Sequence, residues 1–220
     1  MTVRGTGVTA GKSVHPHRAA GVIVCYFTGH DRPMLRPANV VDLPILRALI
    51  RDGAIGGSFD RELASESREA TLFFANLRQA LATGYFVEED PRTGDLATVA
   101  VPGFVYLPEA SAHRPIGFGL FKATAIGYEL WLAGVDTAWR GHGHGRAMIA
   151  ALLKTAPGKS AYVVRVNTFG RESPAMGHLL QSFAYTCVRE TPHYTWYLRD
   201  DAPVELRRLI RNAPNPPHSN

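Results

Sequence analysis

The segment from Glu129 to Met148 carries the residues of this chain whose types and spacing are best suited to chemistry. Its apolar first part ends at Val135 and has the pattern of a strand, and three glycines at alternate positions follow, Gly141, Gly143 and Gly145. Glycine permits backbone conformations closed to other residues and lets a ligand approach the main chain. The first N–H groups of a helix lack intrahelical partners and carry a partial positive charge. A strand, glycine loop and helix in this order therefore predict a site for a phosphate or pyrophosphate.

Two other phosphate-binding patterns do not fit the spacing. A dinucleotide fold places Gly-x-Gly-x-x-Gly directly after its first strand, with an acidic residue about 20 positions later. Here the spacing is Gly-x-Gly-x-Gly, Asp136 to Arg140 separate it from the strand, and no acidic residue has the expected offset. The Gly158-Lys159-Ser160 triplet has Leu153 where a nucleotide triphosphate loop requires glycine, and it precedes an apolar run typical of a strand.

The pattern Arg140-x-x-Gly143-x-Gly145, with Val135 at the end of the strand before it, resembles the cofactor-binding motif of the GNAT N-acetyltransferase superfamily. That motif often begins with Glu-Leu, as Glu129-Leu130 does here, and Thr137 stands where proline is common. The context is similar as well. Met34–Asp42 resembles the usual opening strand and first helix, and the resemblance extends to about Arg199.

The resemblance implies an α/β (α+β) fold with a mixed, mostly antiparallel central sheet, splayed fourth and fifth strands, and flanking helices. Hydrophobic periodicity predicts the same kinds of element. The predicted helices are Asp42 to Arg51 with a stop at Gly53, about Arg61 to Ala82 with a stop at Gly84, Gly145 to Leu153, Ser173 to Phe183, and a short basic one at Val204 to Arg211. The predicted strands are Tyr85 to Glu88, Leu96 to Tyr106, Ile116 to Ala123, Tyr128 to Val135, Tyr162 to Val166, and His193 to Arg199.

Length and composition are consistent with one domain. The 220 residues are 45% hydrophobic, which is enough to bury a core. We expect an acetyltransferase-like domain at 34–200, a flexible extension or an incorrectly assigned start at 1–33, and a peripheral tail at 201–220. No apolar run near the start has the flanks of a signal peptide, and none has the roughly 20 residues needed to cross a bilayer.

The charge and cysteine content narrow the class of partner. The net charge of +5 comes without a long basic run, so an anionic cofactor accounts for it and nucleic acid is not expected. Cys25 and Cys187 are too few for a disulfide framework or a metal site. These features predict a cytoplasmic protein without a membrane partner, and leave a homodimer open.

The resemblance implies acetyl-CoA as cosubstrate. Its pantetheine arm would lie between the splayed strands and pair with the backbone of Leu132, Ala133, Gly134 and Val135. Backbone N–H groups of the loop would hold the pyrophosphate; the loop residues are Arg140, Gly141, His142, Gly143, His144, Gly145 and Arg146. Ser173, at the start of the next predicted helix, is a further expected cofactor-binding residue. The Arg140 side chain either contacts phosphate or braces the loop. His142 and His144 contribute N–H groups, and no cluster of further ligands predicts a metal.

Catalysis in this superfamily is direct attack of an amine on the thioester. Glu129 is the candidate base, and its alternative role is a structural carboxylate bonded to a neighbouring strand. The tyrosine that usually protonates the leaving thiolate is replaced by Leu180. Because a thiol has a pKa of about 8.5, water can replace the missing acid. Ser173, His178 and Tyr185 are substitutes if the helix is shifted.

The sequence does not identify the acceptor, which is expected to be a small molecule or a protein or peptide amine. Its pocket is expected near Ile55 to Arg61 and Glu190 to Tyr194. Asp60, Glu62 and Glu190 are candidates to attract a cationic amine, and Phe59, Trp131, Tyr194 and Trp196 are candidates for an aromatic wall. Two functions remain, an acetyl-CoA-dependent N-acetyltransferase and a catalytically weak or inactive CoA-binding sensor or interaction module.

Overall fold

Seven strands form one mixed sheet in the computed structural model, which describes residues 34–89, 93–109, 113–168, 170 and 173–212. Only β6 and β7 are parallel, and every other neighbouring pair in the sheet is antiparallel. In spatial order the strands are β1 (Met34–Pro37), β4 (Gly103–Leu107), β5 (Gly117–Thr124), β6 (Gly127–Val135), β7 (Ala161–Asn167), β9 (Tyr194–Arg199) and β8 (Tyr185–Glu190). A separate hairpin contains β2 (Tyr85–Glu89) and β3 (Leu96–Ala100).

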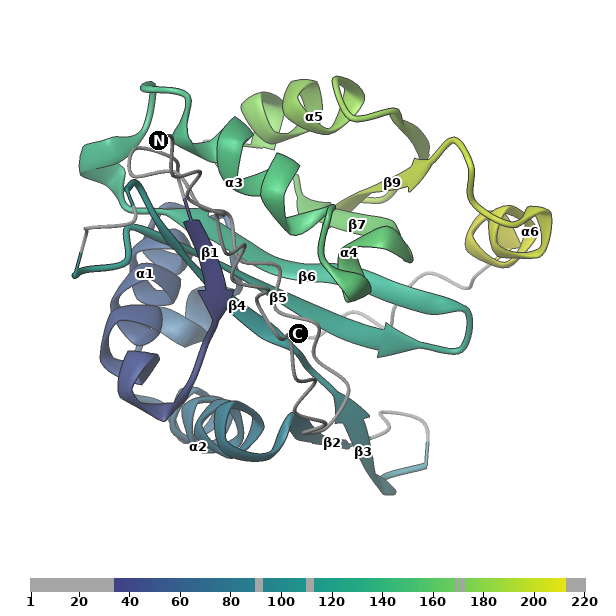
Figure 1. Cartoon of the computed structure of the whole chain (residues 1–220). Helices are drawn as coiled ribbons and strands as arrows, with labels where there is room; N and C mark the ends of the chain where they lie inside the picture. The colour runs from purple at the N-terminus through teal and green to yellow at the C-terminus, as the bar shows by residue number, and fades with distance from the viewer. Residues whose placement is uncertain (1–33, 90–92, 110–112, 169, 171–172, 213–220) are drawn as a thin grey trace, which may run out of the picture.

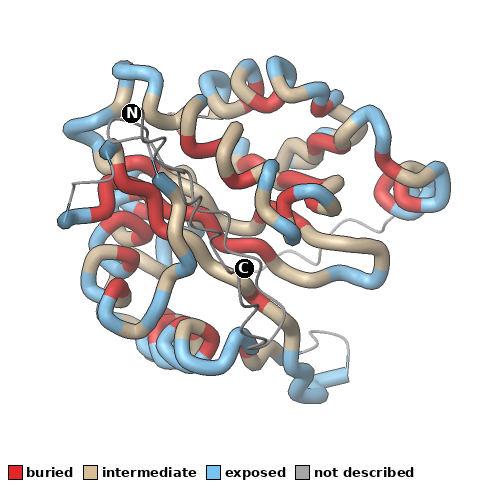
Figure 2. The backbone as a smooth tube through the Cα atoms, in the orientation of Figure 1, coloured by how far each residue is buried: buried red, intermediate tan, exposed pale blue. Residues whose placement is uncertain are grey.

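Helices cover both faces of this sheet (Figure 1). α1 (Leu43–Ile55) and α2 (Arg68–Thr83) lie on one face, and α3 (His144–Leu152) and α5 (Ser173–Gln181) lie on the other. The buried residues concentrate in the sheet and on the sheet-facing sides of the helices (Figure 2). The remaining helical segments are α4 (Ala156–Lys159), α6 (Val204–Asn212), and the 3-10 turns at Val40–Asp42, Arg61–Ala64 and Thr137–Trp139.

The predicted splay is present between β6 and β7. Their pairing runs from Tyr128, opposite Ala161, to Leu130, opposite Val164, and includes no residue of β6 beyond Leu130. The other edge of β6 stays paired with β5 as far as Val135. The last part of β6 therefore presents one edge of its backbone to a gap in the sheet.

Two glycines on β5 bring α3 close to the sheet. A Cβ atom at Gly117 would lie 2.8 Å from the Met148 sulfur, and one at Gly119 would lie 2.5 Å from the Leu152 Cδ1 atom. The residues between and after them, Phe118 and Leu120, are fully buried against the α1 and α2 side. Alternation along β5 thus gives one thin face, on which α3 packs, and one bulky face.

Two predicted elements are wrong in extent because a local feature interrupts each. The predicted helix from Arg61 to Ala82 is a 3-10 turn followed by α2, and Ser67 caps α2 by accepting a hydrogen bond from the Ala70 N–H at 3.1 Å. Its end at Gly84 is confirmed, with φ of 84°. The predicted strand from Leu96 to Tyr106 is two strands, since Pro102 lacks the N–H that continuous pairing requires.

One further boundary differs from the prediction, and one strand was not predicted. α1 continues through Gly53 to Ile55. Gly53 is needed there for space, because a Cβ atom would lie 2.4 Å from the Phe59 ring. The sequence analysis also missed β8, which forms the edge of the sheet after a residue with positive φ, Ala184.

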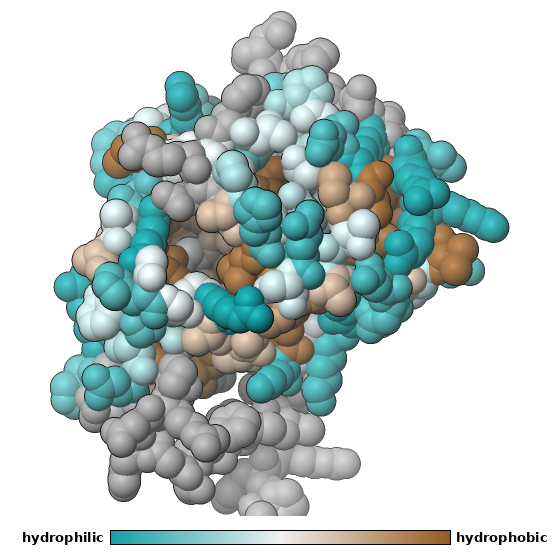
Figure 3. Space-filling model, turned by 90° about the horizontal axis from the view of Figure 1, so that it is seen from above, coloured by the Kyte–Doolittle hydropathy of each residue, from teal (hydrophilic) through white to brown (hydrophobic). Residues whose placement is uncertain are grey.

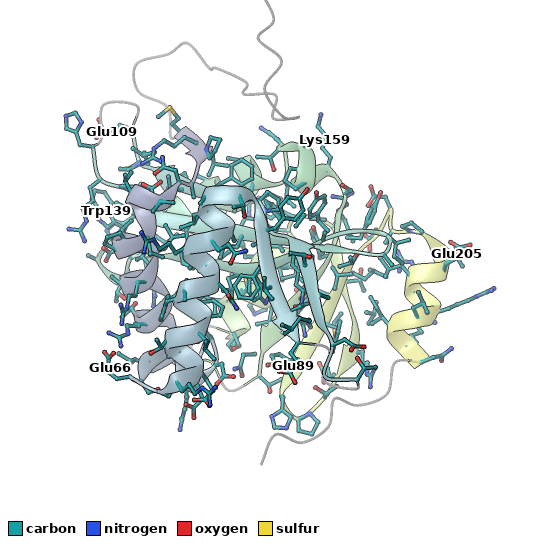
Figure 4. All side chains as sticks on the ribbon, turned by 90° about the horizontal axis from the view of Figure 1, so that it is seen from below. Glu66, Glu89, Glu109, Trp139, Lys159 and Glu205 are labelled. Carbon is teal, nitrogen blue, oxygen red and sulfur yellow. The ribbon has the colours of Figure 1, made fainter. Side chains whose placement is uncertain are left out.

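The predicted basic helix near the C-terminus is confirmed as α6. Leu206 and Ile210 are buried against Val163 and Leu198 of the sheet. Figure 4 shows α6, marked by Glu205, on the opposite side of the molecule from the loop before α2, marked by Glu66. The predictions for 1–33 and 213–220 lie outside the described residues, and the proposed domain boundaries stay predictions.

A buried carboxylate links β1 to the start of α1. Asp42 is 4% exposed and accepts two hydrogen bonds of 2.7 Å from Arg36 and one of 3.0 Å from the Asn39 N–H. Burial raises the pKa of the Asp42 carboxyl, but the hydrogen bonds from Arg36 and Asn39 outweigh it and hold the pKa below its usual value. Asp42 therefore stabilises the fold when it is ionised.

Replacement of this carboxylate tests the linkage. Asp42→Asn should lower the free energy of unfolding at neutral pH by about 1.5–3 kcal/mol, the range for hydrogen bonds to a charged group. The folded pKa lies below the unfolded value, so the stabilisation is present above that value and is lost as the pH falls through the folded pKa. Urea unfolding at neutral and acidic pH measures the difference. If the free energies of unfolding of the parent and the variant differ by the same amount at acidic pH, the stabilising role of the ionised Asp42 is contradicted.

Candidate functional site

A cavity of about 480 Å³ passes through the gap between β6 and β7. It is lined on one side by the α1 and α2 face and on the other by the α3 and α5 face. The predicted cofactor residues that line it are Leu132, Ala133, Gly134, Val135, Arg140, Gly141, Gly145 and Ser173. The part of the cavity lined by these predicted residues, called the cofactor half below, also has many apolar side chains: Met148, Ile149, Val164, Met176 and Leu179. In the view from above, hydrophobic residues are visible between hydrophilic ones in the middle of the surface (Figure 3).

The glycine loop has the geometry of an anion site. Gly141 and Gly143 have φ of 78° and 85°, a region that favours glycine, and Gly143 directly precedes α3. Gly145 lies in the first turn of the helix and has no such φ. A Cβ atom on any of the three would meet no described atom within 4 Å. The space before the helix N-terminus is therefore wide enough for a group larger than a side-chain methyl.

The Arg140 side chain braces the loop. Its Nε donates a hydrogen bond to the Val135 carbonyl at 3.0 Å. Its Nη2 donates to the carboxylate of Asp52 on α1, also at 3.0 Å. The Thr137 hydroxyl donates to the same Asp52 carboxylate at 2.6 Å. These contacts match the bracing role among the two considered for Arg140. The sequence analysis missed Asp52, whose position on the exposed end of a predicted helix gave no signal.

Four predicted cofactor residues lie in the loop or helix but do not line the cavity: His142, Gly143, His144 and Arg146. The two histidine rings have separate partners. Nδ1 of His142 lies 2.8 Å from the Arg140 carbonyl oxygen, and Nδ1 of His144 lies 3.3 Å from the Tyr106 hydroxyl. Arg146 donates to the Ser182 hydroxyl at 3.0 Å and covers the Phe183 ring.

Glu129 forms an ion pair across the parallel strands. Arg165 on β7 donates from Nε to one Glu129 oxygen at 2.5 Å and from Nη2 to the other at 3.2 Å. Burial alone would lower the pKa of the Arg165 guanidinium, but the neighbouring Glu129 carboxylate raises it above its usual value. Both residues line the cavity. These contacts match the alternative role considered for Glu129, a structural carboxylate bonded to a neighbouring strand. Its role as a base stays a prediction.

The substitutes for the missing acid occupy different environments. Leu180 is fully buried in the core, and Tyr185 donates its hydroxyl hydrogen to the Ala161 carbonyl. Burial raises the pKa of Tyr185 to about 12. His178 is exposed and is absent from the cavity lining, whereas Ser173 lines the cavity and donates to the Asn167 carbonyl. Among these three, only Ser173 has access to the site.

The other half of the cavity includes part of the predicted acceptor region. Phe59, Asp60, Trp131 and Tyr194 line it, whereas Glu62, Glu190 and Trp196 are absent from its lining. Ser58, within the predicted stretch Ile55 to Arg61, also lines this half, together with residues that the sequence analysis missed: Leu63, Phe73, Arg165 and Asn167. The signal for Arg165 was available, since an arginine inside an otherwise apolar strand requires a partner.

Searches on the sequence alone found no relatives: no protein-family model matches it, and no curated protein is significantly similar. Solved structures with the same fold do exist. The PaiA N-acetyltransferase from Thermoplasma acidophilum, solved with coenzyme A, matches with a TM-score of 0.54 at 13% identity, over 76% of this chain and 99% of that one. A putative acetyltransferase from Salmonella typhimurium, solved with acetyl-CoA, has a TM-score of 0.51 at 15% identity, over 79% and 97%.

A third structure agrees with these two. An acetyltransferase from Thermus thermophilus matches with a TM-score of 0.50 at 19% identity, over 78% of this chain and 99% of that one. The chain therefore has the GNAT fold over most of its length, and the fold prediction is confirmed. Within the described residues, no helix is both long and apolar enough to span a membrane.

Proposed function

We propose that this protein is an acetyl-CoA-dependent N-acetyltransferase that acts on a primary amine. The observation that carries the proposal is the continuous cavity between β6 and β7, which joins a glycine loop at a helix N-terminus to a second, partly aromatic half. One half has the shape and donors for an acylated cofactor, and the other has room for an acceptor. Solved proteins of this fold with coenzyme A or acetyl-CoA support the choice of cosubstrate.

The residues present fit acetyl-CoA. The splayed edge of β6 at Leu132–Val135 offers backbone groups to a pantetheine arm, which would pair with them as an added strand. The N–H groups at the start of α3 offer donors to a pyrophosphate, and the space before Gly141, Gly143 and Gly145 admits one. When bound, acetyl-CoA supplies a thioester whose acetyl group passes to nitrogen as a C–N bond forms and the C–S bond breaks.

The chain contributes positioning and polarisation to this transfer. A backbone N–H of the exposed segment Leu132–Val135 would stabilise negative charge on the thioester carbonyl oxygen. Glu129 is the candidate to accept the amine proton, through water, while it also neutralises Arg165. Met176 and Leu179 line the cofactor half, and Leu180 replaces the usual acid, so the thiolate would take its proton from water.

Substitution of Gly145 tests cofactor binding. Gly145→Val adds side-chain atoms in open space at a position without positive φ, so the protein should fold normally. The added atoms should block the approach of the pyrophosphate and weaken CoA binding at least about tenfold, a loss of about 1.4 kcal/mol. Calorimetry with CoA measures the affinity. Gly56→Val, at the exposed end of α1, is the matched control. A folded Gly145→Val protein with parental affinity would overturn the assignment.

Two variants of the ion pair test the base. If Glu129 accepts the proton, Glu129→Gln should lower kcat by roughly 10²-fold, measured as thiol release with a saturating primary amine that has no carboxylate. The variant Glu129→Leu/Arg165→Met removes both charges and so avoids an unpaired buried arginine. We expect it to stay as slow as Glu129→Gln, with a melting temperature near that of the parent.

Recovery of parental kcat in the double variant would remove Glu129 from the chemistry and leave it as the counter-ion of Arg165. Absence of thiol release from the parent with every amine, despite CoA binding, would instead favour the CoA-binding sensor or interaction module.

A further inference from the structure

Arg165 and its partner Glu129 both line the cavity, and Arg165 is the more exposed of the two. Its side chain is 30% exposed, against 9% for Glu129. Nε and Nη2 both donate to Glu129, whereas Nη1 has no hydrogen-bond partner among the described residues. The ion pair is neutral as a unit, and Nη1 is the guanidinium nitrogen that takes no part in it.

The surroundings fix this guanidinium in place. Its central carbon lies 5.7 Å from the ring centre of Tyr194 and 5.2 Å from that of Trp196, both on β9. Two aromatic rings and a two-point ion pair hold the side chain in one orientation, which reduces the entropy lost when it binds a ligand. A planar guanidinium held in this way is suited to a carboxylate.

The cavity that Arg165 lines also has an apolar and partly aromatic wall. Phe59, Leu63, Phe73 and Trp131 line it, and each is only half-buried although its neighbours in the core are buried. Phe73 packs against Trp131 with ring centres 5.8 Å apart. This surface is available to a hydrophobic group of the acceptor.

The strand register places the two features close to the reacting groups. Glu129 lies opposite Val163 and Leu130 opposite Val164, so Arg165 comes next along β7 at about the level of Trp131. The backbone expected to bind the thioester arm begins one residue later, at Leu132, a rise of about 3.3 Å. If the amine attacks at the start of this exposed segment, its nitrogen and a carboxylate on Arg165 would be near neighbours in one molecule.

We propose that the acceptor is a free hydrophobic α-amino acid, whose carboxylate binds Nη1 of Arg165 and whose side chain occupies the apolar wall. This inference rests on the proposed acetyl transfer. The amine, deprotonated before attack, would form the new C–N bond, and the CoA thiol would leave as the C–S bond breaks. Arg165 positions the acceptor and takes no proton.

The test compares matched acceptors in the full-length protein. Thiol release from acetyl-CoA is measured with phenylalanine and leucine, with their decarboxylated amines, and with phenylalanine amide. The parent should prefer the amino acids by about 10- to 100-fold in kcat/KM, mainly through KM, as expected for hydrogen bonds to a charged group. Arg165→Lys keeps the positive charge near Glu129 but lacks Nη1, and should abolish most of this preference, measured as the ratio of kcat/KM between the amino acids and the amines without a carboxylate.

Three controls keep the outcome decisive. Arg208→Gln removes an exposed charge on α6 and should leave the preference unchanged. Glu129→Gln/Arg165→Gln, a neutral pair, replaces Arg165→Lys if the latter fails to fold, and should show the same loss of preference. CoA affinity by calorimetry reports separately on the cofactor half.

The proposal is overturned if the parent acetylates the amines without a carboxylate as well as the amino acids, or if the Arg165 variants keep the parental ratio of kcat/KM between the two classes. Absence of CoA binding, or of acetylation of any amine, would overturn the proposed function instead.

Discussion

The end of the pairing between β6 and β7 at Leu130 is the constraint on which the site depends. Pairing with a neighbouring strand satisfies the backbone N–H and C=O groups along that edge of a strand. Beyond the last paired residue, these groups must find other hydrogen-bond partners or face a cavity. β5 stays paired with the other edge of β6 as far as Val135, with a register shift between Leu130 and Leu132 where the second neighbour departs. The gap connects both faces of the sheet, and for that reason a single cavity includes a cofactor half and an acceptor half.

The packing around the gap follows from the same requirement. Gly117 and Gly119 let α3 approach β5, which brings the glycine loop before that helix to the open edge of β6. Asp52 on α1 receives hydrogen bonds from Thr137 and Arg140, so a helix of the opposite face holds this loop in place. Near the start of the gap, the Glu129–Arg165 pair joins β6 to β7 through their side chains. Small residues, one shared carboxylate and one ion pair thus fix the shape of the cavity.

The sequence was sufficient for features encoded by local pattern and insufficient for those set by distant contacts. The glycine loop, the stop at Gly84 and the amphipathic α6 follow from residue types at short spacing, and each was predicted. The predicted helix end at Gly53 was wrong, because this glycine makes room for the Phe59 ring and does not end the helix. The hydrophobic periodicity of the sequence cannot show such a contact. The Glu129–Arg165 contact joins residues 36 positions apart, and the register of β6 on β7 decides it. Side-chain roles in the site therefore required the structure, even where the residues had been named.

The central claim is that the exposed backbone at the end of β6 and the start of α3 binds the acylated cofactor. Hydrogen–deuterium exchange of the full-length protein with and without CoA tests it residue by residue. The account predicts slower exchange on CoA binding at the amides of Leu132–Val135 and of Gly141–Arg146, with no change in β8 or α6. CoA binding that leaves both segments unprotected, or that protects a different surface, would contradict it.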